Sequence, residues 1–186
     1  DNPLEAIKNF RVLAKLFAKE ELAEQKLAAM QQVFEQLKKQ LNQAFLGEVP
    51  KVSSVRFANT SSVYIYGDNS MSQYALAQLG ISAAIHIEKT QWGLVQKRVL
   101  QLSKIQDGAL LYFKPFAQWQ QLQQSRLWQA MPVVRNNRVA AVAATWSYGG
   151  AMSLKYLAQA MASALLTIAR ADTPEPGHIQ GIKAVQ

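Results

Sequence analysis

The sequence predicts an α/β fold: a three-layer lobe around a mixed, mostly parallel sheet, preceded by a long helix. Residues 3–46 repeat apolar side chains at intervals of three and four, the period of an α-helix. From residue 51 onward, short apolar runs of strand length alternate with helical stretches. Such alternation is typical of a sheet whose strands lie mainly parallel, with helices on both faces.

The composition is that of one folded domain, or one lobe of a larger protein. The chain has 186 residues, of which 49% are apolar and 17% charged, and a chain of this length buries a core without covalent staples. The absence of cysteine excludes disulfides and thiolate metal sites. No apolar run reaches the about 18 residues of a membrane span.

The net charge of +8 permits an anionic partner. The basic residues of the first 40 positions are mixed with glutamates on helical sequence, however, which is typical of a solvated helix face and not of a phosphate-binding stripe.

The helical segment is expected to contain two helices joined by a tight bend. Residues 18–21 break the phase between a short apolar stripe and a longer one, and Gly47 and Pro50 end the second helix. The short stripe is Phe10, Leu13 and Phe17; the longer one is Leu27, Met30, Phe34, Leu37, Leu41 and Phe45.

The α/β region is expected to open with a hairpin. Strands are predicted at 51–58, 63–67, 83–87, 108–113 and 138–142, and helices at 69–80 and 150–169, with one or two short helices within 115–131 and a short helix or turn at 96–105. We therefore divide the chain into an inter-lobe helical segment, 1–47, an α/β ligand-binding lobe, 48–171, and a flexible tail, 172–186, which contains two prolines and two glycines.

Motifs for catalysis are missing. The sequence has no glycine-rich phosphate loop, dinucleotide fingerprint or nucleophile elbow. His86 and Glu88 share a face of a predicted strand, but a histidine satisfied by its neighbours is a better interpretation than a metal pair. Asp68, Glu88 and Asp107 are the only acids between residues 51 and 171, and each falls at a turn. Without a positioned acid–base pair, we expect no enzyme.

Aromatic residues gather where the predicted strands end. Ligands collect at the loops after the carboxyl ends of strands, here 67–70, 88–93 and 145–150. Tryptophan and tyrosine suit the walls of a ligand site because they combine rigid apolar area with one hydrogen-bond donor. The candidate binding residues are Tyr64, Tyr66, Trp92, Trp146 and Tyr148, whereas Trp119 and Trp128, on predicted helices, are expected in the core.

Four stretches resemble the C-terminal lobe of a known family. They are "VYIYGDNSMSQYALAQLGI", "TQWG", "SRLWQAMPVVRNNRV" and "TWSYGGAMSLKYL". In this order and near this spacing they resemble the periplasmic ferric-hydroxamate (ferrichrome-type) siderophore-binding proteins of ABC importers, which have the class III periplasmic binding protein fold. The resemblance covers roughly residues 3–169, and the segment before it resembles the helix that joins the two lobes.

The resemblance implies a function and roles for the aromatic residues. Trp146 and Tyr148 match the family's W-x-Y-G motif, which lines the siderophore cleft, Trp92 matches the loop tryptophan, and Tyr64 matches a strand residue in apolar contact with the ligand. No residue ligates iron, because the siderophore holds it, so no cofactor is expected. The implied role is iron transport: binding the ferric siderophore and delivering it to permease subunits in the inner membrane.

The resemblance also implies missing parts and one departure. The family's N-terminal lobe and signal peptide are expected to precede this chain, which implies a periplasmic location and leaves a surface through which the fragment dimerises. Relatives carry a permease-docking acid near the short helix after the W-G loop. Residues 98–101 have none, which puts docking by this lobe in doubt or moves it to an acid such as Asp107.

Other interpretations stay open. The lobe is also compatible with another large chelate: haem, cobalamin, a catecholate or a dicitrate complex. A basic α/β domain that binds nucleic acid is the alternative of a different class. It predicts Lys and Arg beside the loop aromatics, whereas Trp92 stands between Gln91 and Gly93.

Overall fold

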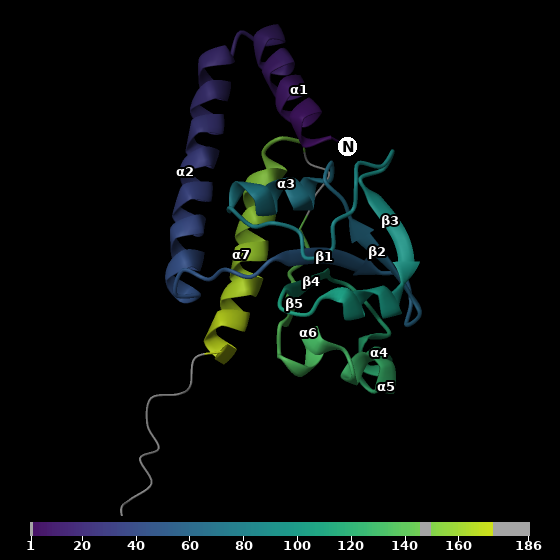
Figure 1. Ribbon diagram of the computed structural model, residues 1–186. Helices are drawn as coiled ribbons and strands as arrows, with labels where there is room; N and C mark the ends of the chain where they lie inside the picture. The colour runs from purple at the N-terminus through teal and green to yellow at the C-terminus, as the bar shows by residue number, and fades with distance from the viewer. Residues whose placement is uncertain (1, 146–149, 173–186) are drawn as a thin grey trace, which may run out of the picture.

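The structure is a computed structural model that describes residues 2–145 and 150–172. Two helices, α1 (Pro3–Leu16) and α2 (Glu20–Ala44), precede an α/β lobe (Figure 1). The strands of the lobe are β1 (Val52–Phe57), β2 (Ser62–Tyr66), β3 (Leu94–Arg98), β4 (Ala109–Phe113) and β5 (Val139–Val142). Its helices are α3 (Met71–Gln78), the 3-10 helix η1 (Val99–Lys104), α4 (Trp119–Gln123), α5 (Arg126–Gln129), α6 (Pro132–Arg135) and α7 (Ser153–Asp172).

The two predicted N-terminal helices are present, with the bend where the apolar phase breaks. The Asn2 side chain accepts a hydrogen bond from the Leu4 N–H and so caps α1. Ala18, between the helices, has a φ of 51°. Arg11 donates to Glu24 at 2.6 and 3.1 Å, which joins α1 to α2, and this hydrogen bond lowers the pKa of the exposed Glu24 carboxyl.

The sheet has the strand order β3-β2-β1-β4-β5. β1 pairs parallel with β4, and β4 with β5, whereas β2 is antiparallel to both of its neighbours, β1 and β3. Only β2 therefore runs against the other strands, so the predicted mixed and mostly parallel sheet is confirmed. The reversal is made by the predicted hairpin, whose turn is closed by N–H groups of Ser61 and Ser62 that donate to the Asn59 side chain at 2.8 Å.

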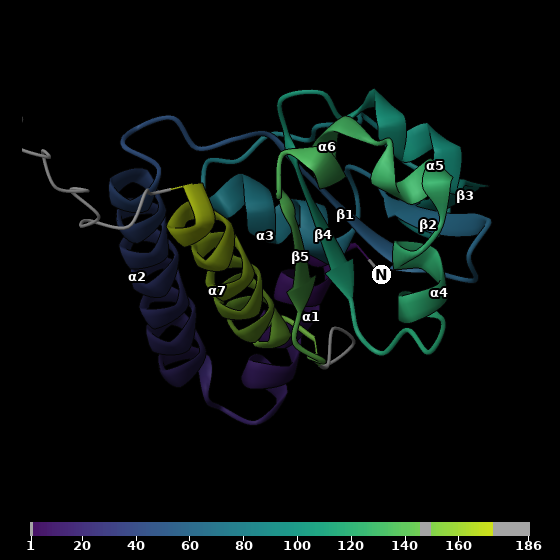
Figure 2. The same cartoon turned by 90° about the horizontal axis from the view of Figure 1, so that it is seen from below.

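Helices cover both faces of the sheet and produce two cores. On one face α3 and α7 pack against the strands, with α2 beside α7 (Figure 2). On the other face lie η1, α4, α5 and α6. Strand alternation sorts the side chains between the two cores: Val52 faces α3 and α7, whereas Val55 and Phe57 face the short helices. The three predicted layers are therefore present.

The short-helix side contains an aromatic cluster. Trp119 stacks on Tyr112 at 4.2 Å between ring centroids, and Trp128 meets Phe57 edge-on at 5.7 Å. Trp128 is 3% exposed. The two tryptophans assigned to packing thus lie where that prediction placed them.

One predicted element is wrong and another is partly right. Residues 83–87 form no strand: the Ile85 N–H donates to the Ser53 hydroxyl at 2.8 Å, and the Ile87 carbonyl accepts from Asp68 N–H at 3.0 Å. The segment is a connection, because β1 and β2 already have partners on both sides. Residues 96–105, expected as a helix or turn, divide between the end of β3 and η1.

The helical segment shares the core of the lobe. Leu27, Met30, Phe34 and Leu41 of α2 are buried in the same cluster as Leu154 of α7. A domain division near residue 47 stays a prediction. Among the described helices, none combines the length and apolarity that crossing a bilayer requires.

Candidate ligand-binding cavity

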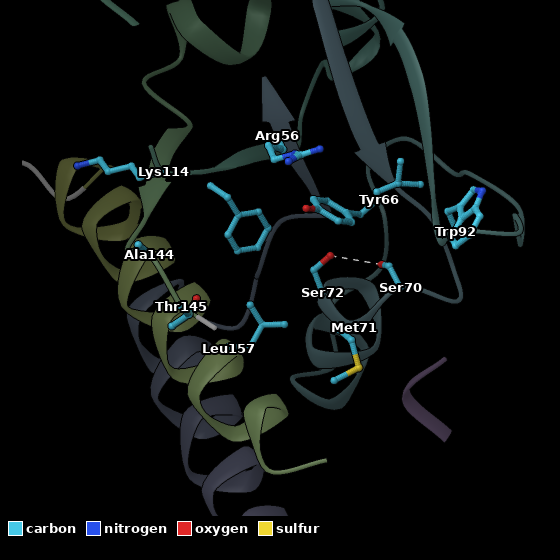
Figure 3. A pocket seen from close by; sticks show the side chains of 12 residues that line it. Arg56, Tyr66, Ser70, Met71, Ser72, Trp92, Lys114, Ala144, Thr145 and Leu157 are labelled. Atoms are coloured by element: carbon cyan, nitrogen blue, oxygen red, sulfur yellow. Dashed lines mark hydrogen bonds between the residues drawn. The ribbon is translucent and has the colours of Figure 1, made fainter. Parts of the chain in front are cut away.

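A cavity of about 190 Å³ opens on the α3–α7 side of the sheet, at the carboxyl ends of β1, β4 and β5 and beside the start of β3 (Figure 3). It lies where β1 and β4 finish and where the chain leaves β5, the edge at which open α/β sheets bind ligands. Its described lining is Arg56, Tyr66, Ser70, Met71, Ser72, Trp92, Leu94, Phe113, Lys114, Ala144, Thr145 and Leu157.

Strand register places the wall that comes from the sheet. Arg56 of β1 lies opposite Tyr64 of β2, so both side chains stand on the cavity face. Tyr66, two residues further on, shares this face and meets Phe113 of β4 edge-on, with ring centroids 5.6 Å apart. The sheet therefore contributes an aromatic pair with a guanidinium beside it.

A chain of serine hydroxyls lies at the start of α3. Ser70 caps the helix by accepting from the Gln73 N–H at 3.1 Å. The Ser54 hydroxyl donates to that of Ser72 at 3.0 Å, and the Ser72 and Ser70 hydroxyls lie 3.3 Å apart. All three serines are buried. These bonds fix the beginning of α3 against β1, so the polar end of the cavity is rigid.

The loop that carries Trp92 is fastened to the turn after β2. The Asn69 side chain donates to the Thr90 carbonyl at 2.7 Å and accepts from the Thr90 N–H at 3.1 Å. The Gly67 N–H donates to the Gly93 carbonyl at 2.9 Å. Gly93 has a φ of 69°, and a Cβ there would lie 3.2 Å from the Ser70 Cα, so this position requires glycine. The loop is held in place while the Trp92 side chain stays 72% exposed.

The structure brings together two of the five predicted site residues. Trp92 and Tyr66 both line the cavity. Tyr64 is on the same sheet face but outside the lining, with the Arg56 guanidinium carbon 5.1 Å from its ring centroid. Trp146 and Tyr148 lie outside the described residues; Ala144 and Thr145, just before them, line the cavity.

Several lining residues were missed from the sequence. Arg56 is a single charged residue in an otherwise buried strand. A charged side chain at such a position indicates that helices leave that part of the sheet face uncovered, so Arg56 could have been predicted to lie at a cavity. Lys114 directly follows the predicted strand at 108–113, and ligands of such sheets bind beside the residues that follow the carboxyl ends of strands, so its place could have been predicted. Ser72 and Leu157 carry no such signal, because their place depends on how α3 and α7 pack.

One of the predicted loops enters the site differently. The loop at 88–93 leads into β3 and does not follow a strand. It reaches the cavity because β2 is reversed, which brings the turn after β2 beside the start of β3.

The acids and histidines of the described chain form no metal site. No group of three or more His, Cys, Asp or Glu lies together within it. His86 Nδ1 is 3.6 Å from Asp68 Oδ1, and its side chain is exposed. The strand on which His86 and Glu88 were expected to share a face is absent, and His86 lies near Asp68.

The chain is similar to a hydroxamate-binding and a siderophore-binding protein. The iron(3+)-hydroxamate-binding protein FhuD of Escherichia coli strain K12 is 31% identical over 103 residues, which are 54% of this chain and 35% of that protein. The crystal structure of the Fe3+–Desferal-bound siderophore-binding protein FhuD from Vibrio cholerae is 48% identical with a TM-score of 0.84, over 88% of this chain and 61% of that one.

More distant structures share the fold alone. FhuD2 from Staphylococcus aureus with bound ferrioxamine B is 15% identical with a TM-score of 0.68, over 88% of this chain and 65% of that one. The resemblance to ferric-hydroxamate-binding proteins that the motifs predicted is confirmed by the first two relatives. The periplasmic binding protein family matches residues 2–144. With the fold and this match together, the chain belongs to the periplasmic binding protein family.

Proposed function

We propose that this chain is a solute-binding lobe for ferric hydroxamate siderophores, which it binds in the cavity beside Trp92. The observation that carries the proposal is an exposed tryptophan, held by a fixed loop at the rim of an aromatic cavity, in a fold that matches an Fe3+–Desferal-bound protein at 48% identity. A tryptophan in the lining of a cavity suits a ligand wall, because it combines rigid apolar area with one hydrogen-bond donor.

The contacts we assign follow from the cavity lining. Trp92 and Tyr66 provide flat apolar walls for the organic part of the chelate, and Trp146 and Tyr148 are proposed to add a further wall after Thr145. The siderophore keeps all the iron ligands, so the protein contacts only the outside of the complex. The bound chelate is then handed to ABC permease subunits, in the periplasm.

Calorimetric titration of this chain with the iron(III) complex of Desferal tests the proposal. We expect saturable binding of one complex per chain, and at least tenfold weaker binding of metal-free Desferal, because only the iron-loaded form is folded into a compact shape that the walls can grip. Trp92→Ala should weaken binding of the iron complex.

Circular dichroism of the same samples shows whether each variant is folded. A folded wild-type chain that takes up neither the iron complex of Desferal nor ferrichrome would refute the proposed function.

A further inference from the structure

Arg56 stands at the rim of the cavity with its guanidinium laid against a ring. The guanidinium carbon is 5.1 Å from the centroid of Tyr64, within the range of a cation–π contact. Arg56 itself is exposed and lines the cavity, whereas Tyr64 is half-buried and does not. In Figure 3 the Arg56 side chain extends above Tyr66 at the cavity edge. The Tyr64 ring thus restricts where the charge of Arg56 can lie.

The positive charge of Arg56 has no anionic partner in the part of the chain that the structure describes. The two described ion pairs join Arg11 to Glu24 and His86 to Asp68, and neither includes Arg56. The described lining of the cavity contains no aspartate or glutamate. A bound molecule therefore experiences this charge without compensation from a neighbouring carboxylate.

Lys114 is the other cation of the lining, and it is placed differently. Its side chain is exposed and extends away from the cavity in Figure 3. No ring or hydrogen-bond partner is recorded for its ammonium within the described residues. Of these two cations, Arg56 is the one that lies against a ring beside the cavity.

We propose that Arg56 is a charge-selecting residue of this cavity, and that Tyr64 is the positioning residue that holds it there. The inference rests on the proposed function and deepens it: among ferric hydroxamates of equal size, the lobe favours neutral and anionic complexes over cationic ones. Tyr64, expected from the sequence to contact the ligand, acts through Arg56 instead.

The size of the effect follows from Coulomb's law. For charges about 10 Å apart, at an effective dielectric constant of about 40 for a site open to water, each unit of ligand charge changes affinity roughly fourfold. Going from a cationic to an anionic complex changes the charge by two units, so we expect roughly a sixteenfold difference. The aromatic walls contribute equally to both complexes, so a cationic complex still binds, but more weakly.

The test uses three iron(III) complexes that share the same iron centre and differ in net charge. Desferal carries a free amine, which can be left free, acetylated or succinylated, so that its iron(III) complex bears a charge of about +1, 0 or −1. The three complexes are titrated by calorimetry into the wild-type chain and into Arg56→Gln. We expect the succinylated complex to bind wild type roughly sixteenfold more tightly than the amine form. We expect the variant to lose most of this preference.

A matched control removes a charge elsewhere. Lys97 on β3 lies opposite Val63, whose side chain is in the core on the other face of the sheet, so Lys97 points away from the cavity. Lys97→Gln changes the net charge as Arg56→Gln does. It should keep the preference, and raising the salt concentration should reduce the preference of wild type.

Two variants of Tyr64 separate positioning from contact. Tyr64→Phe keeps the ring under the guanidinium and should keep the preference. Tyr64→Leu removes the ring and should reduce the preference about two- to threefold, since an exposed cation–π contact is weak. A Tyr64→Leu chain that binds all three complexes equally less well would show direct ligand contact and overturn the positioning role.

Failure of this inference is distinct from failure of the proposed function. Equal affinities of the three complexes for wild type would overturn charge selection and leave the proposed function intact. An unchanged preference in Arg56→Gln would also overturn it. A folded wild-type chain that binds none of the three complexes would refute the proposed function, and the inference with it.

Discussion

Two tryptophans of this chain have opposite environments, and their replacement should have opposite effects. Trp92 is 72% exposed in a loop, whereas Trp128 is 3% exposed in the aromatic cluster. We predict that Trp92→Ala leaves the melting temperature nearly unchanged and weakens binding of the iron complex of Desferal by about tenfold or more. Trp128→Ala should cost about 3–5 kcal/mol of stability, because it opens a cavity in a packed core. Thermal melts and calorimetric titrations of both variants measure this.

The same measurements distinguish between a Trp92 side chain that contacts a ligand and one that packs in the folded protein. A large loss of stability in Trp92→Ala with normal binding would show that this side chain packs in the folded protein and does not serve a ligand. The sequence predicted the role of Trp92 from a glycine that follows an aromatic residue in a loop. It missed Arg56, whose role depends on which part of the sheet α3 and α7 leave open.

The ligand contacts of the W-x-Y-G motif are still a prediction from the sequence. Trp146 and Tyr148 lie outside the described residues, so their contacts rest on the motif alone. We predict that Trp146→Ala, like Trp92→Ala, weakens siderophore binding by about tenfold with little change in melting temperature. Normal binding together with a fall of several degrees in melting temperature would mean that Trp146 belongs to the core.

At the scale of elements, one side chain holds the Trp92 loop. Asn69 both donates to and accepts from the backbone of Thr90. We predict that Asn69→Ala loosens this loop, weakening ligand binding about three- to tenfold while costing about 1–2 kcal/mol of stability, the usual cost of part-buried hydrogen bonds. Hydrogen exchange of the amides at 88–93 should become faster, with α7 unchanged.

Asn69→Asp is the matched variant. It keeps the acceptor for the Thr90 N–H and loses the donor, so its loop should exchange at a rate between those of wild type and Asn69→Ala. Equal exchange in all three proteins would contradict a clamp at Asn69 and place the restraint in the Gly67–Gly93 hydrogen bond.

The errors at this scale have a common physical origin. Residues 83–87 are apolar enough for a strand, yet they bond to a serine side chain and to the turn after β2. Residues 94–98 begin with two apolar residues and end with three polar ones, too short an apolar run to indicate a strand, and still form β3, since β2 offers a free edge. An edge strand is decided by its partner more than by its own side chains. β4, a continuous apolar run, and β1, which lie inside the sheet, were predictable.

At the scale of the whole molecule, the two N-terminal helices were predictable as helices, but their outer surface was only partly predictable. The stripe on α2 is buried as its period required. On α1 and at its C-cap, by contrast, Leu13 is 53%, Leu16 74% and Phe17 72% exposed, and a groove between the two helices is lined mostly by apolar side chains. An apolar surface of this kind in water favours association.

We predict that this chain self-associates through α1 and that the contact buries Leu16 and Phe17. Burying one such side chain contributes about 1.5–3 kcal/mol, so the double substitution Leu16→Glu with Phe17→Glu should raise the dimer dissociation constant at least tenfold. Sedimentation velocity over a range of protein concentrations measures this. Lys15→Glu, on the same helix, is the control for a change of charge and should leave the dimer intact. A wild-type chain that sediments as a monomer at several hundred micromolar, a concentration at which even a weak dimer forms, would contradict self-association and leave the face of α1 to another partner.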